Sequence, residues 1–290
     1  MKLKVFQKGF NYSQDGQGNR LIFHLQGCNM KCPWCSNPEG MPPKGVLVVN
    51  KEWLNESCCP VGAVVHGNLD RTRCESCEER PCTMKRRQKG IQLSYKEYET
   101  DELVAESISS KSMFFDGGGV TLTGGEVTMQ FDAVKELLEK LGEAGIHRAI
   151  ETNGTHPRSA ELIPLVDQWI MDVKHYDDEK HTKWLGVSNR WVIENLKTIS
   201  ALHKDLLVRV PLIPGFNDEP EDAKGFAKLF REVMNCEKTK VEFLAYHEFG
   251  KGKWEQCGME YKMAGERISA AVFKHFETVM KENNIQCVRT

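Results

Sequence analysis

The 290-residue sequence lacks any run of about 18 apolar residues, so it contains no segment that predicts a membrane-spanning helix. Its first residues lack the apolar core of a secretory signal peptide, so we expect a cytoplasmic protein. It also lacks an excess of positive charge, because its formal net charge is −2. That balance disfavours a general nucleic-acid binder. We therefore expect neither a membrane nor a nucleic acid among its partners.

Cysteine, by contrast, is abundant. Eight of the eleven cysteines lie between residues 28 and 82. The cytosol keeps thiols reduced, so this many cysteines in a cytosolic chain indicate metal or cluster ligands rather than disulfides. The other three, Cys236, Cys257 and Cys287, stand alone, and we expect them to be small, buried side chains.

Strand and helix patterns alternate along most of the chain. Strands are expected at 21–26, 119–123, 148–152, 168–173, 206–212 and 240–246. Helices are expected at 130–141, 158–165, 190–202, 220–233 and 265–283. Such alternation predicts an α/β fold with a parallel sheet or barrel. Six units are too few for a complete eight-unit barrel, so we expect a partial (βα)6 TIM-like barrel, with functional residues at the carboxyl ends of its strands.

Residues 50–90 interrupt this pattern. They contain few apolar residues and show no long period, so they need something other than a hydrophobic core to hold them. We expect them to form a small insertion, while residues 1–49 and 91–290 form the barrel.

The first cysteine group follows the first expected strand. Cys28, Cys32 and Cys35 have the spacing C-x3-C-x2-C. Three thiolates on one loop can hold three irons of a 4Fe-4S cubane, which leaves the fourth iron open to a substrate or cofactor. A structural zinc site would instead need a fourth ligand, and the nearest candidate, His24, lies inside the strand.

This spacing resembles the radical S-adenosylmethionine (SAM) superfamily, and further motifs narrow the resemblance to the activating enzymes of glycyl radical enzymes. Those motifs are DGQGNR at 15–20, GGGVTLTGGE at 117–126, ETNG at 151–154, MDVK at 171–174 and YHEFGK at 246–251. The resemblance implies that SAM binds the open iron and is cleaved reductively to a 5′-deoxyadenosyl radical. That radical would abstract hydrogen from a backbone glycine of a partner lyase or dehydratase. No catalytic side chain is then expected beyond the cluster and SAM.

The resemblance also implies which residues hold the cofactor. They are Trp34, Cys35, Ser36, Gly124, Gly125, Glu126, Asp172, Val173, Lys174 and His247. Two positions depart from the family pattern, since relatives often have His where Ser36 stands and Asp where Glu151 stands. Arg209 lies within an expected strand, where it could bind a carboxylate ligand or form a structural ion pair.

The second cysteine group resembles part of a bacterial two-cluster ferredoxin. Cys59 with the following proline matches the tail of one ferredoxin run, and Cys74, Cys77 and Cys82 match the head of another. The resemblance implies one auxiliary 4Fe-4S cluster on these four residues, with Cys58 as an alternative to Cys59. The spacing from Cys77 to Cys82 is wider than in ferredoxins, and a zinc ion held by four cysteines is the alternative.

Two partners and two alternative functions follow. The partners would be a glycyl radical enzyme and a flavodoxin- or ferredoxin-like electron donor, which the basic run 85–89 could meet if it is not simply a solvated loop. One alternative is a radical SAM enzyme acting on a small molecule, although that would require a closed pocket. The other is a zinc-dependent structural or nucleic-acid module.

Overall fold

The computed structural model describes residues 1–75, 77, 80–83, 90–202, 205–263 and 265–290. Its centre is an eight-stranded sheet in the order β12-β11-β10-β9-β8-β2-β1-β7. The strands are β1 (Lys2–Tyr12), β2 (Asn19–Leu25), β7 (Lys96–Glu99), β8 (Gly119–Gly124), β9 (Arg148–Thr152), β10 (Gln168–Asp172), β11 (Leu206–Leu212) and β12 (Lys240–Ala245). The six from β2 to β12 are mutually parallel, which confirms the expectation of a partial (βα)6 barrel.

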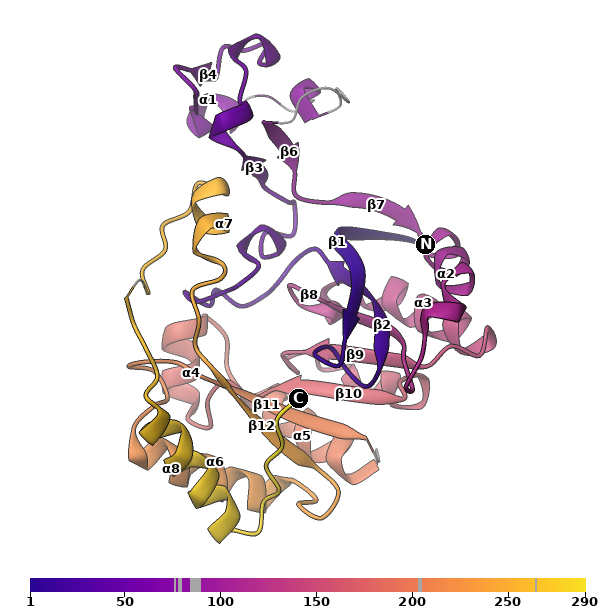
Figure 1. The fold of residues 1–290 in the computed structure, drawn as a ribbon, viewed down its shortest axis with the longest axis vertical. Coiled ribbons are helices and arrows are strands. Elements are labelled where there is room, and N and C mark those ends of the chain that lie inside the picture. The colour runs from indigo at the N-terminus through magenta and orange to yellow at the C-terminus, as the bar shows by residue number, and fades with distance from the viewer. Residues whose placement is uncertain (76, 78–79, 84–89, 203–204, 264) are drawn as a thin grey trace.

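Helices cover the outside of this sheet (Figure 1). They are α2 (Thr100–Ser109), α3 (Phe131–Glu143), α4 (Asp178–Leu185), α5 (Arg190–Leu202), α6 (Pro220–Val233) and α8 (Ala270–Glu282). A further short helix, α7 (Lys251–Gln256), lies away from the sheet, beside residues 47–49 (Figure 1). A 3-10 helix, Ser159–Leu165, connects β9 to β10. None of the helices within the described part of the chain combines the length and apolarity needed to cross a membrane.

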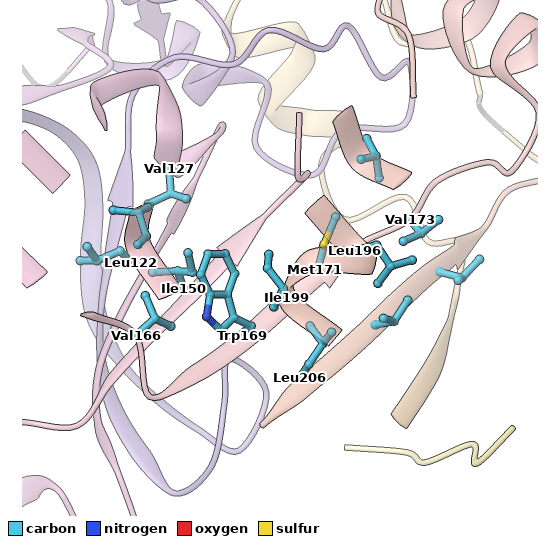
Figure 2. Packing of buried hydrophobic residues seen from close by; sticks show 14 of the residues in the cluster. Leu122, Val127, Ile150, Val166, Trp169, Met171, Val173, Leu196, Ile199 and Leu206 are labelled. Atoms are coloured by element: carbon cyan, nitrogen blue, oxygen red, sulfur yellow. The ribbon is translucent and has the colours of Figure 1, made fainter. Parts of the chain in front are cut away.

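The main core lies between the sheet and these helices. In Figure 2, Ile150 and Trp169 from adjacent strands face Ile199 of α5. The parallel strands are buried on both faces, so their sequences are nearly continuous apolar runs. In α3, by contrast, the apolar residues recur at helical spacing and all face the core. Fully burying each such side chain contributes about 1.5–3 kcal/mol.

Several elements differ from the sequence-based expectation. The strands β1 and β7 and the helices α2 and α4 were not predicted. Only one face of β1 is buried, through Leu3 and Val5, and its outer half is exposed, so it gives a weak pattern. Helix α4 is short and polar; it begins where the Asp177 side chain accepts a hydrogen bond from the Lys180 amide and ends at Gly186, which has φ +81°. The expected helix at 265–283 begins only at Ala270.

The cysteine-rich segment stands apart from the sheet, at the top of Figure 1. Its stem is the antiparallel pair β3 (Leu47–Val49) and β6 (Ile91–Leu93), and it also contains a small hairpin, β4 (Val64–Val65) with β5 (Asn68–Leu69), and a short helix, α1 (Arg71–Glu75). Its buried hydrophobic cluster is small and includes two cysteines: Leu47, Val49, Ala63, Val64, Cys74, Cys82 and Ile91. A core of this size supplies little folding stability, so the segment needs a further stabilising interaction, such as metal ligation by its cysteines.

Candidate active site

The loop after β2 carries the first three cysteines, and backbone hydrogen bonds fix its shape. The amide of Cys28 donates to Met41 O at 2.9 Å, and the amide of Lys31 donates to Leu185 O at 3.0 Å. The second bond ties the loop to the end of α4. Cys28, Cys32 and Cys35 all line one cavity of about 280 Å³, which lies at the carboxyl edge of the parallel strands.

The three thiols share one electrostatic environment. Burial raises the pKa of each of Cys28, Cys32 and Cys35 to about 12, while the ammonium of Lys174 lowers it. Iron binds the thiolate and not the thiol. A buried cation beside three convergent thiols therefore fits an anionic cluster with three cysteine ligands.

The alternative zinc site finds no fourth ligand in His24. Its ring packs against Phe6, with centroids 5.5 Å apart, and it does not line the cavity. Among the residues that the structure describes, no three His, Cys, Asp or Glu side chains are grouped to hold a single metal ion. A cubane attaches each cysteine to a different iron and so spaces its ligands more widely.

Most of the residues predicted to hold the cofactor meet in this cavity. Those that line it are Trp34, Cys35, Ser36, Gly124, Gly125, Glu126, Asp172, Lys174 and His247. Val173 is the exception, because its side chain is fully buried in the main hydrophobic core. The residues come from the ends of different strands, and the parallel sheet brings those ends to one edge.

The two glycines at the end of β8 are required by the sheet itself. A Cβ on Gly124, which has φ +134°, would lie 2.2 Å from the amide nitrogen of Leu25, and one on Gly125 would lie 2.3 Å from Gly27 O. The amide of Gly125 already donates to Leu25 O at 2.9 Å. The pair therefore packs the ends of β8 and β2 together, which also brings the backbone of β8 to the cavity wall.

Glu126 is a buried carboxylate that links the residues after β8 to the end of β9. It is only 2% exposed, and its carboxylate accepts hydrogen bonds from Thr128 Oγ1 at 2.5 Å, Thr152 Oγ1 at 2.7 Å and the Asn153 amide at 2.7 Å. Burial raises its pKa, and these donors oppose that shift. The carboxylate thus fixes the end of β9 against the residues that follow β8.

We expect the substitution Glu126→Gln to destabilise the protein by about 1–3 kcal/mol, because the new amide group would face the Asn153 amide and leave a buried donor unpaired. The midpoint of anaerobic thermal unfolding, followed by circular dichroism, should fall by several degrees. Glu232→Gln, an exposed substitution on α6, is the matched control and should change little. Equal midpoints for the two variants would contradict this role for Glu126.

Asp172 and Lys174 form an ion pair beside the cysteines. Their side chains lie 2.6 Å apart, and Lys174 is buried. Burial alone would lower the pKa of Lys174, but Asp172 and the sulfurs of Cys32 and Cys28 raise it above its usual value. Lys174 therefore carries its positive charge inside the cavity.

Arg209 forms a structural ion pair with two carboxylates. Its guanidinium lies 2.6 Å from Glu151 and 2.8 Å from Glu242, and it also donates to the carbonyl of Gln14. Glu242 in turn accepts hydrogen bonds from the amide and the hydroxyl of Thr290, both at 2.7 Å. Arg209 and Glu151 themselves line the cavity, so this network forms part of its wall and links the C-terminal Thr290 to β11 and β12.

Asn153 is a site residue that the sequence reasoning missed. Its side-chain amide donates to Asn29 Oδ1 at 3.0 Å and lies 4.0 Å from the sulfur of Cys28. Asn29 also donates to Thr155 Oγ1 at 2.7 Å. The turn after β9 therefore supports the cysteine loop. Asn153 directly follows a strand, within the motif ETNG, and this position could have indicated its role at the site.

The second cysteine group is clustered as well. Burial raises the pKa of Cys74, and the nearby thiols of Cys82, Cys59 and Cys77 raise it further. The sulfur of Cys59 also accepts a hydrogen bond from the Ala63 amide at 3.1 Å. The side chain of Cys58 and the basic run 85–89 lie outside the described residues.

Comparisons with known proteins agree with this site. Residues 22–227 match the sequence profile of the Radical SAM superfamily. The chain is 30% identical over 292 residues to the 4-hydroxyphenylacetate decarboxylase activating enzyme of Clostridium scatologenes, covering 94% of this chain and 92% of the relative. It is 33% identical over 288 residues to the choline trimethylamine-lyase activating enzyme of Oleidesulfovibrio alaskensis, covering 90% and 92%.

The fold, the loop with three cysteines and the profile match together define this chain as a radical SAM protein. The full-length similarity goes further, and the chain belongs to the activating enzymes of glycyl radical enzymes within that superfamily. A radical SAM methyltransferase from Sphaerobacter thermophilus has a similar fold, with a TM-score of 0.55 and 13% identity over 97% of this chain and 72% of that one.

Proposed function

We propose that this chain holds a 4Fe-4S cluster at Cys28, Cys32 and Cys35, binds SAM in the cavity beside it, and activates a glycyl radical enzyme. The observation that carries the proposal is the meeting of these three thiols, Cys35 among them, with eight further expected cofactor residues in one cavity. When bound, the cluster would supply one electron for cleavage of SAM to methionine and a 5′-deoxyadenosyl radical, which takes a hydrogen atom from a backbone glycine.

The chain's own residues would position the cofactor and keep water out. Trp34 packs against Phe216 and Trp184, with ring centroids 5.0 and 6.2 Å apart, and so forms an apolar wall behind the cysteines. The buried ammonium of Lys174 would favour the carboxylate of SAM and the anionic cluster. The two glycines after β8 would let the methionyl end of SAM approach the backbone closely.

Two observations favour a polypeptide substrate over a small molecule. Within the described residues the sheet does not close, because β12 and β7 are its edges. An open barrel admits a loop of another protein, whereas a small substrate requires an enclosed pocket. The relatives above are also named as activating enzymes of a decarboxylase and a lyase. The partner would accordingly be a decarboxylase, lyase or dehydratase with a glycyl radical, and a flavodoxin- or ferredoxin-like protein would supply the electron.

We also propose that residues 50–90 form a ferredoxin-like insertion with one auxiliary 4Fe-4S cluster on Cys59, Cys74, Cys77 and Cys82. Support comes from the mutual proximity of these thiols and from the small core around them. Cluster ligation would add the stability that this core lacks.

The decisive experiment follows the hydrogen atom. Reduced, SAM-loaded protein is mixed with a glycine-centred peptide that carries deuterium on the glycine α-carbon. We expect deuterium in the 5′-deoxyadenosine, detected by mass spectrometry, because the radical abstracts that atom directly. A peptide with alanine in place of the glycine is the control and should leave little stable radical in the electron paramagnetic resonance spectrum. If the peptide keeps its deuterium while a small metabolite is altered, the small-molecule alternative replaces this function.

A further inference from the structure

Phe249 presents its aromatic ring to solvent beside the cavity. It is 85% exposed, the largest fraction among the large hydrophobic side chains of the described residues. Its ring stacks on His247, with centroids 4.2 Å apart and an angle of 27° between the planes. His247 lines the cavity, and so does Leu244, which is 37% exposed. The ring of His247 therefore links the cavity wall, which includes the apolar side chain of Leu244, to the exposed ring of Phe249.

The loop that carries Phe249 is held firmly on both sides. A Cβ on Gly250 would lie 2.6 Å from Cys35 O, so the loop packs directly against the cysteine loop. The indole of Trp254 donates to Cys35 O at 2.8 Å, and the hydroxyl of Tyr246 donates to Met263 O at 2.6 Å. Phe249 is thus an exposed side chain on a fixed backbone, which lowers the cost of ordering it in a complex.

We propose that Phe249 is a docking residue for the partner polypeptide and packs against an apolar side chain that flanks the reacting glycine. The inference rests on the proposed function. Glycine has no side chain to recognise, so the recognition must come from its neighbours in the sequence. An extended chain advances about 3.3 Å per residue, so residues a few positions from the glycine reach the mouth of the cavity. Rigid aromatic side chains are typical anchors of protein interfaces.

The test uses cluster- and SAM-loaded protein with two labelled glycine-centred peptides, which carry either leucine or serine at the positions two and three residues from the glycine. Dissociation constants come from fluorescence anisotropy. The wild-type protein should bind the leucine peptide about tenfold more tightly than the serine peptide. Phe249→Ala should lose that preference, whereas Phe249→Tyr should keep it. Phe115→Ala removes another exposed ring, 49% exposed and paired with Tyr12, and should behave as wild type.

Three outcomes would overturn the inference: a wild-type protein that does not distinguish the peptides, a Phe249→Ala variant that still does, or a variant whose SAM affinity falls by the same factor as its peptide affinity. The last result would place the ring in the SAM site. Failure of the proposed function looks different, because the wild-type protein would then transfer no deuterium from either peptide.

Discussion

A variant with Cys28→Ala, Cys32→Ala and Cys35→Ala is expected to lose all SAM cleavage and about half of its iron. The anaerobically purified wild-type protein should hold about eight irons, four in each cluster, and the variant about four. Cys28, Cys32 and Cys35 are the cysteines among the described residues that line the cavity, so no described neighbour can replace them. Iron and zinc contents are measured by plasma emission spectroscopy, and 5′-deoxyadenosine by chromatography after reduction with dithionite.

The matched control removes cysteines elsewhere. Cys236 and Cys287 lie away from the cavity and pack against the main core. The double variant with Cys236→Ala and Cys287→Ala should therefore keep all its iron and its SAM cleavage. Near-equal zinc and iron in the wild-type protein would show that the insertion binds zinc. Twelve irons per chain would refute a single auxiliary cluster. Full iron content in the triple variant would contradict the assignment of the cavity cysteines.

The parallel strands and the cysteine loop could be predicted because their signals are local. Buried parallel strands read as short apolar runs, and α3 carries its core positions at a 3.6-residue spacing. The spacing of Cys28, Cys32 and Cys35 lies within eight residues of sequence. Strand β1 has only one partly buried face and an exposed outer half, and α4 is too short and polar to show a period, so neither was predicted.

The rest of the site depends on contacts between distant residues. Asn153 meets Asn29 across 124 positions, and Arg209 meets Glu151 across 58. From the sequence alone, Arg209 could either contact a bound ligand or form an ion pair. Both roles require the same charged residue inside a strand. Only the pairing of β9 and β11 with β10 determines which carboxylate lies within reach. Long-range electrostatics of this kind follow from topology and not from local pattern.

We therefore expect the stability of the barrel to fall sharply when Arg209 is replaced. Arg209→Met leaves the buried carboxylate of Glu242 and the partly buried carboxylate of Glu151 without their counter-ion, and breaking a buried pair in this way costs about 3–5 kcal/mol. We expect urea unfolding of the iron-loaded variant at pH 8 to show a loss of this size. Arg231→Met, which removes an exposed guanidinium on α6, is the control and should cost little.

The pH dependence of this loss follows from Glu151. Burial raises its pKa to about 7 even though Arg209 opposes the shift, whereas a carboxyl in the unfolded chain has a pKa of about 4.3. The folded state therefore binds the proton more tightly, and ionising Glu151 removes stability as the pH rises from about 4.3 through 7. Without the guanidinium the folded pKa rises further, so acidification from pH 8 to 5.5 should restore part of the stability that Arg209→Met loses. Adding Glu151→Gln should restore part of it at pH 8. A loss that grows on acidification, or one equal to that of Arg231→Met, would show that the ion pair does not stabilise the barrel.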